Sequence, residues 1–216
     1  MNTVKYLYIR NDNNLKPFHV KKTMKKAEII FGTLAIIGLT INLLDIPGGI
    51  VLTVLTLSII STLYMYLSFA LFNDIRLGKI FKKDSYKRIS TMKIVGAIMV
   101  GFALSITMIG ILFKFQSWPG ASFNLGFGLF WLLICSIVGL IKYLKTKSDY
   151  YTKIFKRIAI YGVIGLVLMI LPRKTWLEVR NRNHPEYIEA VKKAWADPEN
   201  QELWDKVNEE RQRMNE

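Results

Sequence analysis

The chain has 216 residues, of which 51% are hydrophobic, and its 30 Lys and Arg residues against 16 Asp and Glu residues give a formal net charge of +14. The apolar residues gather in long runs, which excludes an ordinary soluble domain and predicts an all-α polytopic membrane protein with short soluble segments. Nucleic-acid binding is not expected, because no basic-aromatic motif accompanies the positive charge.

The chain begins with a polar and basic segment, residues 1–28, which we expect to be cytoplasmic. No cleavable signal peptide is expected, since the apolar run that follows continues into a second apolar stretch. Glu28 closes this segment, at the inner end of the first predicted membrane helix, where we expect its carboxylate to reach water.

The first apolar run, 29–72, contains one charged residue, Asp45. A continuous helix of that length would far exceed the roughly 30 Å hydrocarbon core, so the chain must turn back. Pro47 and Gly48 mark the turn, because Pro removes an amide donor and Gly tolerates unusual dihedral angles. This hairpin predicts two membrane helices, at 29–44 and 49–72.

A second apolar run, 94–141, repeats the pattern after a basic loop at 73–93. The two runs align without a gap at a constant offset of 72 residues, so that Pro119 and Gly120 match the Pro-Gly pair of the first turn. Trp118 is suited to the membrane interface. The chain is therefore predicted to contain a duplicated hairpin, with helices of the second copy at 94–114 and 120–141.

A second basic loop, 142–157, leads to a shorter apolar run at 158–172. A run of this length can form a membrane span or a re-entrant or interfacial segment. We expect a fifth membrane helix, because two apolar residues extend the run and the two basic residues beside them can carry their charges to the interface. These residues are Ile154, Phe155, Lys156 and Arg157.

Basic residues are distributed unevenly between the two sides of this topology. Seven precede the first span, seven lie between the second and third, and six follow the fourth, whereas the two turns contain only Lys114. The positive-inside rule then predicts a cytoplasmic N-terminus, cytoplasmic long loops and external turns. Five spans place the tail outside, although the four cations nearest the membrane favour the opposite side. The basic face is expected to contact anionic lipid of the bilayer.

The tail, 173–216, is the only segment with the pattern of a soluble domain. Asn183 is expected to cap one amphipathic helix, and Asp197 with Pro198 to begin a second. This C-terminal helical hairpin either packs on its own protein or docks a partner. The apolar residues predicted for docking are Tyr187, Val191, Trp195, Leu203, Trp204 and Val207.

The residue types that catalysis requires do not occur together at any one place in the sequence. His19 and His184 fall on opposite sides of the membrane, and Cys135 stands alone in the fourth span, where it is expected to pack as a small apolar residue. No phosphate-binding loop, catalytic triad or carboxylate pair occurs at motif spacing. We therefore expect no enzyme activity, no cofactor and no metal site.

Polar residues at the two turns form the candidate site. Asn42 and Lys114 occupy equivalent positions in the two copies, and Asp45 follows three residues after Asn42. One interpretation is an outward-facing polar site in which Lys114 pairs with Asp45, since ionisable groups near a membrane usually find partners. The other is that Lys114 extends to the interface beside Trp118.

The second turn, 112–121, reads Leu-Phe-Lys-Phe-Gln-Ser-Trp-Pro-Gly-Ala and resembles the turn of the membrane hairpin in the GldL family of Bacteroidota gliding-motility proteins. The resemblance covers about residues 105–141 and implies a multi-pass protein of a bacterial inner membrane with a periplasmic turn. Members of that family are stators of a proton-driven motor and use a Glu in the second helix of the hairpin. This chain has no acidic residue at 121–141, so the motor role is not expected.

Two functions remain in view. The first is a non-catalytic inner-membrane scaffold or accessory subunit, whose C-terminal helices dock another membrane or periplasmic protein. The second is a small transporter or channel subunit built around Asn42, Asp45 and Lys114. Repeats favour transport folds, but these two hairpins share one orientation and neither contains a break at mid-membrane, so we favour the scaffold.

Overall fold

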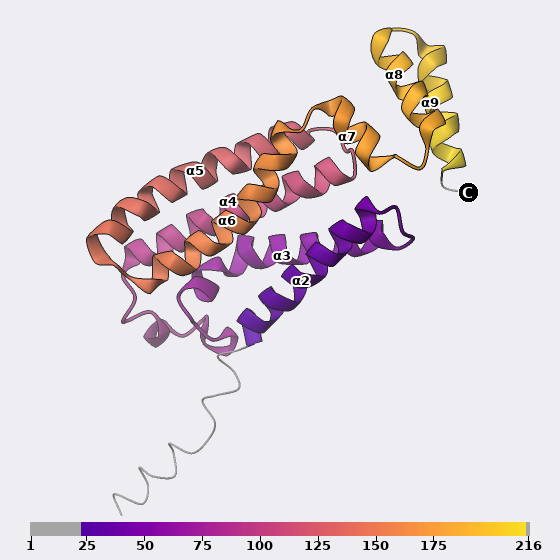
Figure 1. Ribbon diagram of the computed structural model, residues 1–216. Coiled ribbons are helices and arrows are strands. Elements are labelled where there is room, and N and C mark those ends of the chain that lie inside the picture. Colours follow the sequence, from indigo (N-terminus) through magenta and orange to yellow (C-terminus); the bar gives the residue numbers. More distant parts are fainter. Residues whose placement is uncertain (1–22, 215–216) are drawn as a thin grey trace, which may run out of the picture.

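A computed structural model describes residues 23–214, which form α-helices and two short 3-10 turns, without a strand in that range (Figure 1). The predicted all-α class of a polytopic helical membrane protein is confirmed. Most of the predicted N-terminal segment, with His19, lies outside the described residues. The elements are α2 (Thr23–Leu43), α3 (Gly49–Phe72), η1 (Leu77–Lys79), η2 (Lys83–Ser85), α4 (Thr91–Phe115), α5 (Ala121–Thr146), α6 (Asp149–Ile170), α7 (Arg173–Arg180), α8 (Pro185–Ala196) and α9 (Gln201–Arg213).

Helices α2 to α5 are each long and apolar enough to cross a membrane, whereas α6 meets this standard only together with α7, from which it is bent by 107°. Large apolar side chains remain exposed along these helices, as at Ile29 (66%), Val51 (61%) and Leu133 (59%). Such surfaces are suited to acyl chains and not to water. The chain is a multi-pass membrane protein whose apolar helices contact the lipid bilayer.

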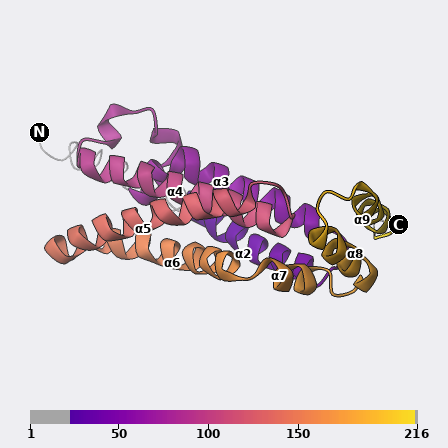
Figure 2. The same ribbon diagram turned by 90° about the horizontal axis from the view of Figure 1, so that it is seen from above.

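Helix α6 runs alongside α5 for the length of the bundle (Figures 1 and 2). Its 22 residues correspond to about 33 Å of helix, which is enough to cross the hydrocarbon core. Val163, Val167 and Ile170 are exposed on it, so α6 presents an apolar face outward like its neighbours. The bend to α7 comes after this face ends.

The two turns of the repeat have the same backbone conformation. The helices before them end, and the helices after them begin, 72 residues apart. Positive φ angles recur at Asp45 (59°) and Gly48 (85°) in the first turn and at Ser117 (53°) and Gly120 (80°) in the second. Each first helix closes with a six-residue C-cap hydrogen bond, from Ile46 N to Ile41 O (3.1 Å) and from Trp118 N to Phe113 O (2.9 Å). The repeat predicted from the sequence thus extends to the local structure.

Glycines allow α4 to approach its neighbours closely, and α4 packs against α3, α5 and α6. A Cβ at Gly101 would lie 2.5 Å from the Tyr64 carbonyl oxygen of α3, and a Cβ at Gly110 would lie 2.6 Å from Leu125 Cα of α5. Helix contacts through small residues are the usual means of association within a membrane. Helix α4 is accordingly the centre of the bundle.

The helices extend beyond the predicted spans on the basic side of the bundle. Residues 142–157 are not a loop, because α5 continues to Thr146 and α6 begins at Asp149. Lys147, with a φ of 50°, ends α5, and the Ser148 side chain caps α6 by accepting from Tyr150 N at 3.4 Å. Long basic side chains can carry their charges to water while the helical backbone continues. Basic residues therefore do not mark the ends of these helices, and the predicted spans are too short on this side. Only the loop at 73–90, with its two 3-10 turns, remains a long connection.

The tail contains one helix more than predicted. Helix α7 has eight residues, too few for its apolar positions to establish a helical period. His184, and not Asn183, is the N-cap residue of α8, with Pro185 in the first turn. Asn200 caps α9 by accepting from Glu202 N at 3.1 Å, because the chain still turns at Asp197. The predicted cap at Asn183 and the predicted start of the second helix at Asp197 are therefore wrong.

Helices α8 and α9 form a hairpin, which we call the arm, at one end of the bundle (Figure 2). The predicted apolar stripes face each other in a small core of their own. Its buried members are Leu177, Tyr187, Ala190, Val191, Ala194 and Val207, and Ile188, Trp195, Leu203, Trp204 and Met214 pack against them. The arm is thus internally packed and is joined to the bundle through α7.

Candidate functional site

The predicted polar site at the turns is dispersed in the structure, beginning with Asp45. His184 Nε2 lies 3.0 Å from Asp45 Oδ2 and donates a hydrogen bond to it, and Arg180 Nη1 lies 3.5 Å from Asp45 Oδ1. The tail, and not Lys114, therefore supplies the partners of Asp45, and the predicted pair of Lys114 with Asp45 is not formed. His184 and Asp45 lie at the same end of the bundle, which also places the tail beside the first turn.

Asn42 lies inside the first hairpin and does not face outward. Its side chain is buried, and its Nδ2 donates to Thr53 Oγ1 of α3 at 3.5 Å. A Cβ at Gly49 would lie 2.5 Å from Asn42 N, so the two helices of the hairpin are in backbone contact at this level. Asn42 is part of the contact between α2 and α3.

Lys114 lies in the second turn region, next to the tail. Its carbonyl oxygen accepts a hydrogen bond from Trp176 Nε1 of α7 at 3.1 Å. The Trp118 ring lies edge-to-face on Phe113, with 5.2 Å between ring centroids, and is 43% exposed. The second turn is thereby joined to α7, as the first turn is joined to α8.

A cleft of about 420 Å³ lies between the second turn, α7 and the arm, and we call it the arm cleft. Four of the five tryptophans of the chain line it, together with three cations and no acidic residue. The aromatic and basic side chains that line it are Lys114, Trp118, Phe123, Arg173, Trp176, Tyr187, Trp195, Trp204 and Arg211. Arg173 lies over the Trp195 ring at 4.0 Å from its centroid, a cation–π contact that connects α7 to the arm.

The residues predicted for partner docking are used mainly within the arm. Tyr187, Val191 and Val207 are buried there, at 9%, 5% and 2% exposure, and Trp195, Leu203 and Trp204 pack around them. Five of the six, all except Leu203, also contribute to the wall of the arm cleft. A partner that enters the arm cleft would therefore contact five of these six side chains.

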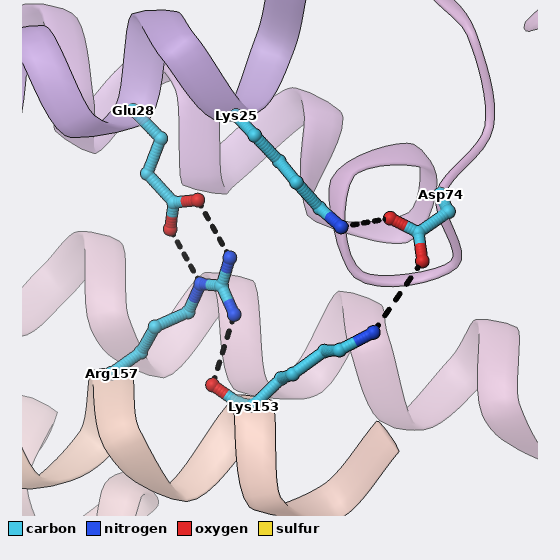
Figure 3. Close-up of polar contacts among 5 residues, drawn as sticks. All are labelled: Lys25, Glu28, Asp74, Lys153 and Arg157. Atoms are coloured by element: carbon cyan, nitrogen blue, oxygen red, sulfur yellow. Dashed lines mark hydrogen bonds and ion pairs between the residues drawn. The ribbon is translucent and has the colours of Figure 1, made fainter. Parts of the chain in front are cut away.

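A second polar cluster lies between the helices near the start of α2, away from the turn that ends this helix. Figure 3 shows its charged side chains. Arg157 of α6 binds Glu28 of α2 in a bidentate ion pair, with Nε to Oε1 at 2.5 Å and Nη2 to Oε2 at 2.6 Å. Arg157 Nη1 also donates to the Lys153 carbonyl oxygen at 2.9 Å. The two side chains are 15% and 11% exposed, so this is a largely desolvated pair.

Aromatic side chains complete the surroundings of this ion pair. Tyr64 of α3 donates its hydroxyl to Glu28 Oε1 at 2.5 Å. The Arg157 guanidinium lies 5.0 Å from the centroid of the Phe72 ring, and Tyr161 contacts Tyr64 edge-to-face at 6.0 Å between ring centroids. The cluster therefore joins α2, α3 and α6, which come from both halves of the sequence.

A more exposed pair lies beside the buried one. Asp74, in the loop after α3, pairs with Lys25 of α2 and lies 3.7 Å from Lys153 Nζ of α6 (Figure 3). These side chains are between 39% and 52% exposed. Asp74 thus links the same helices as Glu28, but in contact with water.

The expectations that Glu28 reaches water and that Arg157 extends to the interface are wrong, because the two side chains face each other. One signal was present in the sequence: Glu28 is the only acidic residue within α2. A lone carboxylate in an apolar helix needs a partner. The partner lies 129 residues away and is one of several cations near the ends of the helices, so sequence spacing alone does not identify it.

The described residues contain no group of three or more His, Cys, Asp or Glu side chains placed to hold a metal ion. Cys135 is a free, buried cysteine. The geometry accordingly offers three features for function: the arm cleft, the Glu28 and Arg157 cluster, and the apolar outer surface. No protein-family model, curated protein or solved structure matches this chain.

Proposed function

We propose that this protein is a non-catalytic scaffold or accessory subunit of a membrane complex, and that it binds a partner protein in the arm cleft. One observation carries the proposal: the tail is fixed at the end of the bundle by contacts with both turns. Trp176 donates to the second turn, and His184 and Arg180 contact Asp45 of the first. A tail fixed in this way presents its cleft in one orientation.

The chemistry of the arm cleft indicates the kind of partner. Tryptophan and arginine are the residues most enriched at the energetic centres of protein interfaces, and the cleft combines four tryptophans with Arg173 and Arg211. Because its lining has three cations and no acidic residue, a complementary segment would carry acidic side chains beside apolar ones. We therefore propose a partner segment of that composition.

The proposed location is a bacterial inner membrane, in the phylum Bacteroidota, with the N-terminus in the cytoplasm and the arm in the periplasm. The excess of basic residues at the end of the bundle opposite the arm supports this orientation through the positive-inside rule. The resemblance of the second turn to the GldL family supports the organism group and the periplasmic turn. In this orientation the basic face contacts anionic lipid.

The test is cross-linking from within the cleft in the native membrane. Phe123 lines the cleft and is 75% exposed, so a photo-reactive amino acid there reports what enters it. The protein that carries only the cross-linker is expected to give one discrete cross-linked partner. This product is expected to disappear when Lys114→Glu is added, because the substitution reverses one of the three cleft charges. Lys206→Glu makes the same change of charge on exposed α9, outside the cleft, and is expected to keep the partner.

Three results would contradict the proposal. The first is no cross-link other than to lipid, the second is an unchanged cross-link in Lys114→Glu, and the third is an equal loss in both charge variants. The last result would indicate that net charge of the tail, and not the cleft, attracts the partner.

A second function, transport, is favoured by the buried Glu28 and Arg157 pair. Ionisable groups inside a membrane usually mark ion or substrate pathways. The site would be this cluster and not the turns, since Asn42, Asp45 and Lys114 lie apart. Proton and cation flux through reconstituted wild-type protein, abolished by Glu28→Gln in protein that still elutes as a folded species, would favour transport over the scaffold. Absence of flux through wild-type protein would exclude the transport function.

A further inference from the structure

An apolar groove lies on the outer surface of the bundle, between the first half of α4, the second half of α5 and the start of α6. Its volume is about 460 Å³, within the range of about 300–1,000 Å³ usual for ligand pockets. It opens onto the membrane-facing surface, where Val95 and Val138 are 48% and 52% exposed. Its apolar lining includes Val100, Ile134, Cys135, Val138 and Ile154.

Two lysines and no acidic residue line this groove. Lys93 is in the first turn of α4 and Lys142 is in the last part of α5, so both stand near the ends of their helices. Tyr150 holds the α4 side in place: its hydroxyl donates to the Lys93 carbonyl oxygen at 2.9 Å, and Lys93 Nζ lies 5.4 Å from the centroid of its ring. The groove therefore has an apolar body and a positive end.

Gly96 is one of the residues that line the groove. A Cβ at this position would meet nothing within 4 Å, so the groove has an open recess at Gly96 that a larger side chain could fill. Gly96 lies one helical turn from Lys93, between the positive end and the apolar body of the groove.

We infer that this groove binds one anionic glycerophospholipid, with an acyl chain along α4 and α5 and the phosphate group near Lys93 and Lys142. The groove faces the hydrocarbon region, where the neighbouring molecules are acyl chains. A zwitterionic lipid would bring its own cation to the two amines, whereas an anionic headgroup neutralises them. Basic pockets between membrane helices have this preference for anionic headgroups.

This inference deepens the anionic-lipid contact proposed above, and it rests on that proposal only in requiring that the bundle spans a bilayer. It does not depend on the arm cleft, which has different lining residues, and the arm lies at the other end of the bundle from the turn between α5 and α6 (Figure 1). A partner protein could bind in the cleft whether or not the groove holds a lipid.

The test uses delipidated full-length protein and two synthetic lipids with identical acyl chains, phosphatidylglycerol and phosphatidylcholine. Native mass spectrometry measures how much of each stays bound from an equimolar mixture, and we expect roughly a tenfold preference for phosphatidylglycerol, from two amines acting together. A second readout comes from Cys135, which lines the groove and is the only cysteine of the chain. Phosphatidylglycerol is expected to slow its alkylation by N-ethylmaleimide more than phosphatidylcholine does.

Two variants separate the parts of the groove. Lys93→Gln with Lys142→Gln is expected to abolish the preference between the lipids, and Gly96→Phe is expected to fill the recess and remove the protection of Cys135. Lys145→Gln with Lys156→Gln is the matched control, since it removes two exposed lysines of the same end that do not line the groove. This control is expected to keep the preference.

Equal retention of the two lipids by wild-type protein would overturn the inference. The inference would also fail if the Lys145 and Lys156 control lost the lipid preference as fully as the groove variant. Diffuse surface charge would then account for the preference for phosphatidylglycerol. If Gly96→Phe does not elute as folded protein, the lysine variants still decide the question. Failure to insert into vesicles, measured by co-flotation, would instead contradict the membrane assignment on which both proposals depend.

Discussion

The two ends of the bundle each contain a carboxylate that binds a distant arginine, but the two contacts differ in burial. Glu28 and Arg157 are 11% and 15% exposed and form two short hydrogen bonds. Asp45 is 28% exposed and lies 3.5 Å from Arg180, with His184 as its second partner. The first pair joins helices α2 and α6, with Tyr64 of α3 as a further partner, whereas the second joins a turn to the tail.

This difference determines how strongly each end is held. Removing one member of a buried pair leaves an uncompensated charge in a medium of low dielectric constant, while a partly exposed charge is screened by water. We therefore expect the Glu28 end to contribute more to the stability of the bundle than the contact of the tail with Asp45 does.

The largest expected effect comes from breaking the buried pair on one side only. Arg157→Met removes the guanidinium and leaves Glu28 buried, with Tyr64 as its remaining donor. We expect a loss of about 3–5 kcal/mol in the free energy of unfolding, measured by denaturant titration in a mild detergent. The double variant Glu28→Leu with Arg157→Met has no buried charge at this site and is expected to recover most of the loss.

Two results would contradict this prediction. If Arg157→Met costs no more than an exposed pair, at about 1 kcal/mol or less, the cluster is wet and the two ends do not differ. If the double variant is no more stable than the single one, the loss comes from packing against the Phe72 ring and not from the charge.

A smaller effect is expected from the hydroxyl that supports the pair. Tyr64→Phe keeps the ring contacts but removes the donor to Glu28, and a hydrogen bond to a charged group contributes about 1.5–3 kcal/mol. The same titration measures it, and Tyr66→Phe, on an exposed side chain of the same helix, is the control. An equal effect of the two substitutions would show that Tyr64 does not act through Glu28.

The architecture was largely predictable because membrane helices are specified by length and hydrophobicity. The offset of 72 residues identified the turns at Pro47 and Pro119 and was confirmed at the level of φ angles. Within the basic segment 142–157, the helical structure is interrupted only between α5 and α6, at Lys147 and Ser148. The sequence does not indicate this position, since basic residues are compatible with both helix and loop. Helix boundaries were accordingly less accurate than helix existence.

The polar contacts could not be predicted, for a different reason. They join residues 129 and 139 positions apart, and the sequence offers many cations for each carboxylate. Asp45 and Lys114 occupy neighbouring positions in the two aligned copies, but Arg180 and His184 of the tail contact the Asp45 carboxylate instead. Which cation reaches it depends on the bend of 107° between α6 and α7, and no local pattern in the sequence indicates that bend.

The contact between the tail and the first turn can be weakened by a substitution at Asp45. Asp45→Asn removes the charge bound by Arg180 and His184, and we expect a cost of about 1 kcal/mol or less, because the pair is partly exposed. Unfolding of the bundle should hardly change, whereas cleavage between α7 and α8 by added protease should become roughly threefold faster. Asp84→Asn, which removes an exposed pair with Lys87 in the loop before α4, is expected to leave this cleavage unchanged.

The smallest expected effect concerns the contact between α7 and the arm. Lys192 Nζ of α8 donates to Glu178 Oε1 of α7 at 2.6 Å, and this hydrogen bond lowers the pKa of the Glu178 carboxyl from its ordinary value of 4.5. A lowered pKa in the folded state means that the contact stabilises the arm above pH 4.5 and that this contribution is lost as the pH falls below it. Carboxyl carbon chemical shifts of Glu178 should titrate below the ordinary value in wild-type protein and return toward it in Lys192→Met. Because Glu178 is exposed, the lowering of its pKa should become smaller with added salt. A pKa that does not respond to salt would contradict this prediction, because it would show that the contact between Glu178 and Lys192 is shielded from water.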